Sequence, residues 1–300
     1  MSVYQHIASN KRKSFAIVLG FLAFTGLSVY VLMRAFGYGL EAMGFALIVS
    51  GISSFVGYWY SDKVILTMSG ARPADRERDF MFYTVAENLS LVSRLPMPKL
   101  YVIEDTAMNA FATGRDPEHA VVVATTGLLD RLDRSELEGV IAHEFSHIQN
   151  YDIRLMSVVA VLVGLIALLA DFFLRFGGMG GRSRDDNEKN GAQAFFIVAG
   201  VVLALLSPII AQLIQLAVSR SREYLADASA AKLTRQPSAL ASALAKLDHD
   251  HEPLEAANKA TAHLYITNPL KNQHSAVGWF AGLFMTHPPI SERISRLKSM

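Results

Sequence analysis

The sequence predicts a mainly α-helical integral membrane protein, with about four transmembrane helices and an α+β domain in which a small sheet accompanies a helix with two histidines. Three observations predict this fold class. Of the 300 residues, 51% are hydrophobic and only 18% are charged, which is apolar for a soluble chain of this size. Four long apolar runs account for this bias. A helical segment between the second and third runs carries the two histidines, four residues apart.

The composition excludes several classes of site. The chain has no cysteine, so disulfides, thiolate nucleophiles and cysteine-type zinc sites are excluded. Any metal site must therefore use nitrogen and oxygen donors. The net charge of +1 gives no support to nucleic-acid binding, which needs a concentrated basic face.

The apolar runs cover about 14–33, 42–60, 155–170 and 192–218. The first two contain no charge and reach the length of about 20 residues that a membrane span requires. The third run is shorter, and the fourth contains Pro208, which a membrane helix can tolerate. A buried helical hairpin in a soluble core is the alternative interpretation of the last two runs.

The flanking charges predict how the chain is threaded through the membrane. Lys11, Arg12 and Lys13 precede the first run, and only Arg34 follows it, so the N-terminus is expected in the cytoplasm. The first run is too long for a cleaved signal peptide. We expect a multi-pass protein of the cell inner or plasma membrane, with the segments outside the membrane spans mainly in the cytoplasm. The predicted divisions are a pair of transmembrane helices (1–60), the first part of the cytoplasmic domain (61–154), a membrane hairpin (155–218) with an exposed Gly-rich loop (172–191), and the second part of the domain (219–300).

The first cytoplasmic part shows both helical and strand patterns. Phe82, Val85, Leu89 and Val92 follow helical spacing within 78–93. The short runs 99–103, 110–113 and 120–125 are rich in β-branched or apolar residues and predict a small sheet. Asp133 followed by Glu136 predicts a capping box at the start of the helix that carries the histidines.

His143 and His147 lie on one face of that helix, within about 40° of each other around its axis. Both imidazoles can therefore reach one cation. Glu144 lies beside them, where it can take a proton from a metal-bound water. The pattern predicts a zincin-type catalytic domain, while a capped amphipathic helix with two incidental histidines is the alternative.

A catalytic zinc needs a third protein ligand and one open position. Metzincin spacing fails, because Asn150 and Ile153 stand where that class has glycine and histidine. Glu223, which follows the fourth apolar run, can supply the ligand from a second helix, and Asp227 on the same face can accept a hydrogen bond from a ligand histidine. Glu223 could instead be an ordinary surface carboxylate; Asp227, Glu252 and Glu255 are then the next candidates.

At this point the sequence resembles the HtpX family of membrane zinc metalloproteases, relatives of the CaaX prenyl proteases. The resemblance covers nearly the whole chain. It includes the N-terminal runs and the motifs at 109–114, 143–152, 221–227 and 286–290. It implies one Zn²⁺ per chain held by His143, His147 and Glu223, with Glu144 as general base. It further implies a metalloendopeptidase that cleaves damaged or misfolded membrane proteins on the cytoplasmic side of the lipid bilayer.

The resemblance also implies two less central roles. Asn109, Ala110, Phe111 and Ala112 resemble a strand that binds substrate by backbone pairing, although they could be a plain core strand. His287 resembles a late histidine that stabilises the oxyanion, although it could simply belong to the turn before two prolines. Three other functions stay open: a structural metal site, a transporter or channel, and a protease with its ligands inside the bilayer.

Overall fold

The computed structural model describes residues 59–159, 220–250, 252–254, 261, 264–267 and 288–300, together with scattered positions between 12 and 55. The loop 172–191, the fourth apolar run, most of the other three runs and His287 lie outside these residues. No helix among the described residues is both long and apolar enough to cross a membrane.

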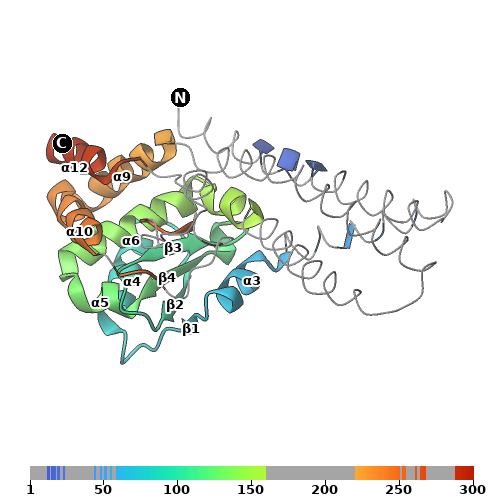
Figure 1. The fold of residues 1–300 in the computed structure, drawn as a ribbon, viewed down its shortest axis with the longest axis horizontal. Helices are drawn as coiled ribbons and strands as arrows, with labels where there is room; N and C mark the ends of the chain where they lie inside the picture. Colours follow the sequence, from blue (N-terminus) through green and yellow to red (C-terminus); the bar gives the residue numbers. More distant parts are fainter. Residues whose placement is uncertain are drawn as a thin grey trace, which may run out of the picture.

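A four-stranded sheet forms one layer of the described fold (Figure 1). Its strands are β1 (Arg72–Pro73), β2 (Lys99–Ile103), β3 (Ala110–Thr113) and β4 (Val121–Thr125), in the order β1-β2-β4-β3. β2 and β4 are parallel, and the two outer pairs are antiparallel. The three predicted strands are confirmed. The two-residue β1 was not predicted, because it is too short to show an alternating pattern.

The described helices are α3 (Ser61–Met68), α4 (Phe80–Ser93), α5 (Thr126–Arg131), α6 (Arg134–Gln149), α9 (Arg220–Thr234), α10 (Pro237–His249) and α12 (Ile290–Lys298). The predicted helix at 78–93 corresponds to α4, and Phe82, Val85 and Leu89 are buried as its spacing predicts. The prediction for Val92 is wrong, because this side chain is 64% exposed. The helix ends one residue later at Ser93, and Arg94 turns the chain away with a left-handed φ of 57°.

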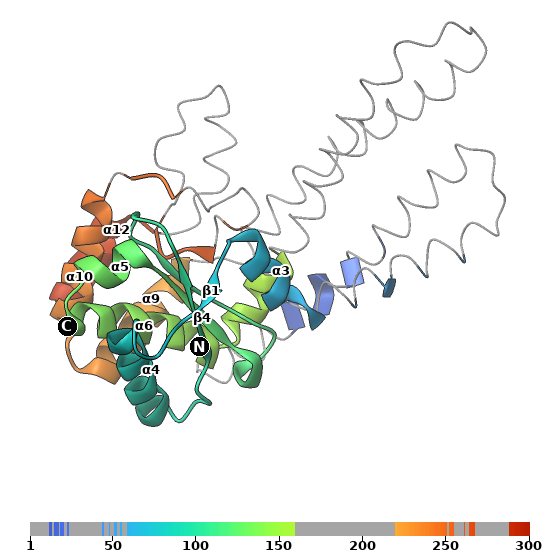
Figure 2. The same cartoon turned by 90° about the horizontal axis from the view of Figure 1, so that it is seen from below.

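The helix α6 lies across the sheet, in contact with the helices around it (Figures 1 and 2). It packs against α4, α9, α10 and β3, and its apolar residues belong to the main core. Gly139 lets α10 approach closely, since a Cβ atom there would lie 3.0 Å from the Leu240 Cα. This packing fixes the helix that carries the histidines.

The start of α6 has the predicted capping box. The Asp133 side chain accepts a hydrogen bond from the Glu136 backbone N–H at 2.9 Å, and the Glu136 carboxylate accepts one from the Asp133 N–H at 2.9 Å. The Glu136 carboxylate also binds Ser242 Oγ at 2.7 Å and Lys246 Nζ at 2.6 Å, both on α10. One buried carboxylate therefore caps α6 and ties it to its neighbour.

Candidate metal centre

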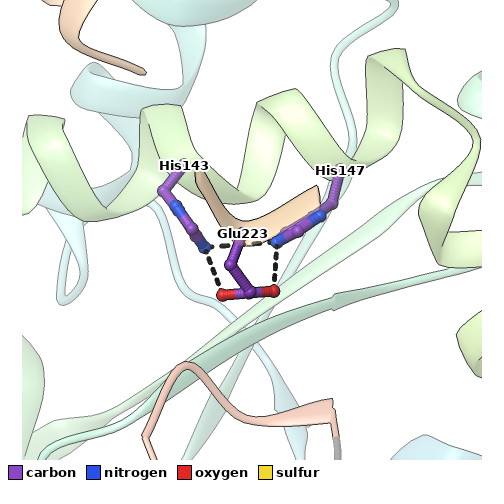
Figure 3. A group of neighbouring side chains, drawn as sticks. All are labelled: His143, His147 and Glu223. Carbon is purple, nitrogen blue, oxygen red and sulfur yellow. Dashed lines mark hydrogen bonds and ion pairs between the residues drawn. The ribbon is translucent and has the colours of Figure 1, made fainter. Parts of the chain in front are cut away.

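Two helices from distant parts of the sequence bring the predicted ligands together (Figure 3). His143 and His147 project from one face of α6, and Glu223 projects toward them from α9. The two Nε2 atoms lie 3.2 Å apart. Glu223 Oε2 lies 3.6 Å from His143 Nε2, and Oε1 lies 3.5 Å from His147 Nε2. One donor atom from each residue falls within 4.8 Å of the others.

Each imidazole has a carboxylate on its other nitrogen. Asp227, one turn after Glu223, places Oδ1 3.0 Å from His143 Nδ1. Asp152 places Oδ2 3.1 Å from His147 Nδ1. The chain reaches this position because Tyr151, just after the end of α6, adopts a left-handed φ of 58°. A carboxylate that accepts from Nδ1–H leaves the Nε2 lone pair facing the ligand cluster. Sequence reasoning identified Asp227 as such a partner but missed Asp152.

Two buried arginines stand behind these carboxylates. Arg293 on α12 binds Asp227 through two parallel bonds, from Nε to Oδ2 at 2.9 Å and from Nη2 to Oδ1 at 2.7 Å. Arg222 on α9 lies 3.6 Å from Asp152 through its Nε. Sequence reasoning missed both residues in this role. The signal for Arg293 lay in α12 itself, where the arginine shares one helical face with Ile290, Ile294 and Leu297.

The cluster is shielded from water. His143 is 1% exposed, His147 5% and Glu223 1%, and Glu144 on α6 is buried with them. The buried carboxylates are Glu144, Asp152, Glu223 and Asp227, against the guanidinium groups of Arg222 and Arg293. With neutral imidazoles the buried charged groups therefore sum to −2. A buried uncompensated charge is expensive, so this site favours a cation, and a divalent one cancels the excess.

The neighbouring charges also shift the pKa values of the histidines and of Asp227. Burial alone would lower the pKa of His143, but the carboxylates of Asp227 and Glu223 outweigh it and raise the pKa to about 9. For Asp227, burial acts to raise the pKa, but His143 and Arg293 lower it to about 2. Burial likewise opposes a raised pKa at His147, where Asp152 and Glu223 prevail. The surroundings thus stabilise positive charge at the imidazoles.

The donor geometry fits a tetrahedral metal ion. Donors held about 2.0–2.1 Å from such an ion lie about 3.3–3.4 Å apart. The two Nε2 atoms lie 3.2 Å apart, close to this value, and each has one Glu223 oxygen at 3.5 or 3.6 Å, Oε1 for His147 and Oε2 for His143. With a single oxygen as the third donor, the three atoms lie within 4.8 Å of one another. When both Nδ1 atoms donate to carboxylates, both Nε2 atoms present lone pairs, which repel at this distance unless a cation lies between them. Among the described residues, the group contains no fourth histidine or carboxylate donor.

The remaining predicted site residues fall in different places. Ala110, Phe111 and Ala112 belong to β3, one of the two edge strands of the described sheet, and Asn109 directly precedes it. Part of the outer edge is already in use, because Ala110 O accepts a hydrogen bond from Ile266 N at 3.0 Å. The fallback ligand Glu252 lies elsewhere and contacts Arg131 at 3.7 Å. Glu255, like His287, lies outside the described residues.

Comparisons with known proteins show which family the chain belongs to. The model of "Peptidase family M48" matches residues 77–300. A "Protease HtpX homolog" of Tropheryma whipplei (strain Twist) is 46% identical over 298 residues, covering 99% of this chain and 98% of that protein. Another from Caldanaerobacter subterraneus subsp. tengcongensis is 43% identical over 302 residues, covering 100% and 98%.

Among solved structures, S. mikatae Ste24p is 20% identical with a TM-score of 0.47, covering 98% of this chain and 66% of that one, and this weak likeness carries no argument here. The match to the family model and the relatives that align over the full length show the family without this structure. The chain belongs to peptidase family M48, is related over its whole length to the HtpX proteases, and is a metalloendopeptidase.

Proposed function

We propose that the chain is a zinc-dependent membrane endopeptidase that cleaves damaged or misfolded membrane proteins on the cytoplasmic side. His143, His147 and Glu223 are its metal ligands, and Glu144 is its general base. The observation that carries the proposal is the buried group of two imidazoles and one carboxylate, whose nearest donor atoms lie 3.2 to 3.6 Å apart.

Zinc suits this donor set better than magnesium or calcium. The latter ions take oxygen donors, whereas two imidazole nitrogens and one carboxylate form a common set of catalytic zinc. Three protein donors leave one position of a tetrahedron for water or substrate, whereas a structural zinc site has four protein donors. The group of three among the described residues therefore favours the catalytic interpretation over a structural site.

The residues of the site divide the chemical work between them. When bound, the zinc ion supplies a Lewis acid that polarises the scissile carbonyl and makes a water molecule more acidic. Glu144 takes a proton from that water and delivers it to the leaving amine. Asp227 and Asp152 hold the Nδ1 protons of the two histidines, which keeps both Nε2 lone pairs directed at the metal. His287, with a donor near the oxyanion, completes the proposed set.

The substrate main chain binds beside the edge strand β3 in this proposal. Thr125 N donates to Asn109 O at 3.0 Å, which fixes the alternation along the antiparallel pair. The N–H and C=O groups of Ala110 and Ala112 therefore point away from β4. Because Ile266 already binds Ala110, we assign the added peptide strand to the outward groups of Ala112, the next such position along this edge.

Membrane anchoring rests on the four apolar runs of the sequence, of which two precede the histidines and two lie between the histidines and Glu223. The α6 helix leads toward the third run, and α9 begins directly after the fourth. An even number of crossings between them puts His143 and Glu223 on one face of the membrane, as a shared metal ion requires. A site of this kind lies near the bilayer surface, where segments of membrane proteins are within reach.

The base is tested with Glu144→Gln in the full-length protein, purified in detergent. This variant should bind zinc as the wild type does and lose cleavage of a quenched fluorescent peptide by at least about a hundredfold. The matched control is Glu138→Gln, which removes one carboxylate from the same helix at a half-buried position. Normal cleavage by Glu144→Gln would refute the assignment.

The orientation can be tested because the chain has no cysteine of its own. Glu118 is exposed next to β4, so Glu118→Cys creates a single accessible thiol. A membrane-impermeant maleimide should not label it in intact cells and should label it in inverted vesicles. Labelling from outside intact cells would place the catalytic domain on the opposite side.

A further inference from the structure

Among the described residues, Arg293 has the largest side chain that is fully buried, with 0% exposure. It enters the metal centre from α12, close to the C-terminus. Both oxygens of Asp227 accept hydrogen bonds from it, at 2.9 and 2.7 Å. Its third nitrogen, Nη1, lies 3.6 Å from Glu223 Oε2 and donates to Ile266 O at 3.4 Å. One guanidinium group therefore contacts Asp227, which is the partner of His143, and also Glu223 itself.

Stability is a poor explanation for this arrangement. Removing a guanidinium from water costs several kcal/mol, and buried ion pairs are often no more stable than apolar residues of similar volume. The position of the pair is more informative. Asp227 Oδ1 accepts from Arg293 Nη2 and also lies 3.0 Å from His143 Nδ1, so the arginine holds the same oxygen that orients the histidine.

We propose that Arg293 is a positioning residue of the metal centre, which locks the Asp227 carboxylate in the orientation that directs the His143 Nε2 lone pair at the metal. This inference rests on the proposed ligand set. The planar fork of a guanidinium matches a carboxylate with two parallel bonds, whereas an ammonium group makes a single point contact. The shape of the side chain matters in this role, and its charge alone does not suffice.

The second histidine offers an internal comparison. Behind His147, Asp152 meets Arg222 at 3.6 Å, beyond hydrogen-bond distance. Behind each histidine there is thus a carboxylate and then an arginine. The arginine is hydrogen-bonded to the carboxylate behind His143, whereas the one behind His147 is not within hydrogen-bond distance. The loss of fork geometry at Arg293 should weaken metal binding more than the same change at Arg222.

The test measures zinc affinity by competition with a chromophoric chelator, on full-length protein in detergent. Arg293→Lys should lower the affinity about tenfold to a hundredfold, as the loss of groups that orient ligands does. Arg222→Lys should lower it less. The matched control is Arg296→Lys, three residues along α12, where the side chain is half exposed and pairs with Glu292; its affinity should equal that of the wild type.

Cobalt substitution supplies a readout that a purely structural role would not change. The visible d–d absorption bands of the Co²⁺ form should shift in Arg293→Lys and stay unchanged in Arg296→Lys. Circular dichroism and gel filtration show whether each variant folds. If Arg293→Lys does not fold, Asp227→Asn, which keeps the shape of the side chain, should produce the same loss of affinity. Where both fold, the double variant should be no weaker than Asp227→Asn alone.

Three outcomes overturn the inference: zinc affinity of Arg293→Lys within twofold of the control, unaltered cobalt bands, or fully additive effects of the Arg293 and Asp227 changes. His147→Ala, measured in parallel, separates this failure from failure of the proposed function. If His147→Ala also keeps full affinity, the ligand set itself is wrong. If it loses zinc while Arg293→Lys does not, only the positioning role fails.

Discussion

The Glu136 carboxylate should make a large contribution to the stability of the helix that carries His143 and His147. It is 4% exposed and accepts three hydrogen bonds, from Asp133 N, Ser242 Oγ and Lys246 Nζ. Glu136 is the N3 residue of the capping box, and loss of the hydrogen bond that it accepts from Asp133 N costs about 1 kcal/mol. Each buried bond to a charged group contributes about 1.5–3 kcal/mol, but the Lys246 side chain is 43% exposed and its share must be discounted. Glu136→Ala should therefore destabilise the fold by about 2–4 kcal/mol.

Thermal unfolding of the zinc-saturated protein in detergent measures this loss. At about 2–4 °C for each kcal/mol, Glu136→Ala should lower the midpoint by about 5–15 °C. Glu138→Gln on the same helix removes one charge without such a network and should change the midpoint little. A midpoint for Glu136→Ala within 2 °C of the wild type, on the scale of about 2–4 °C per kcal/mol, would refute the reasoning.

The same carboxylate predicts a dependence on pH. Burial acts to raise the pKa of Glu136, but the bonds from Lys246 and Ser242 outweigh it and hold the pKa below its ordinary value. Because the folded pKa is the lower one, the stabilisation is complete above the unfolded value of about 4.3 and is lost as the pH falls through the folded value. The difference in midpoint between wild type and Glu136→Gln should therefore shrink at acidic pH. A difference that stays constant from neutral to acidic pH would contradict this cause.

Two further predictions concern substrate and metal. Ala112→Pro removes an N–H that points away from β4, so KM should rise about tenfold. Because Ala112 is only 3% exposed, circular dichroism must first show that the variant folds; unchanged peptide kinetics in the folded variant would argue against binding at this strand. Removal of the metal by a chelator should lower the thermal midpoint and abolish cleavage, and zinc should restore both, because the cation offsets the buried excess of negative charge; a midpoint that does not change with metal content would count against a metal site at His143, His147 and Glu223.

Sequence reasoning worked where the signal is local or depends on the order of segments. Strands β2 and β4 and the capping box of α6 follow from short patterns in consecutive residues. The convergence of Glu223 with the two histidines followed from segment order and the motif. Such inferences need no knowledge of side-chain packing.

The groups behind the ligands were not predictable in the same way. Arg293 meets Asp227 at a sequence separation of 66 residues, and no spacing rule links them. Asp152 reaches His147 only because Tyr151 adopts a left-handed backbone conformation, which is uncommon for a tyrosine. An arginine on an apolar helix face was visible in the sequence, but identifying its partner required the packing of α12 against α9.

The charges explain why the C-terminal helix belongs to the active centre. The α6 segment and its extension contribute the carboxylates of Glu144 and Asp152, while α9 adds two more and one arginine. Without α12, four buried carboxylates would face a single guanidinium, and a divalent cation would leave a net negative charge. Arg293 brings that balance to neutrality with zinc bound and neutral imidazoles. Docking of α12 and binding of the metal are therefore coupled through Asp227, since each removes part of the electrostatic cost that the other would otherwise meet.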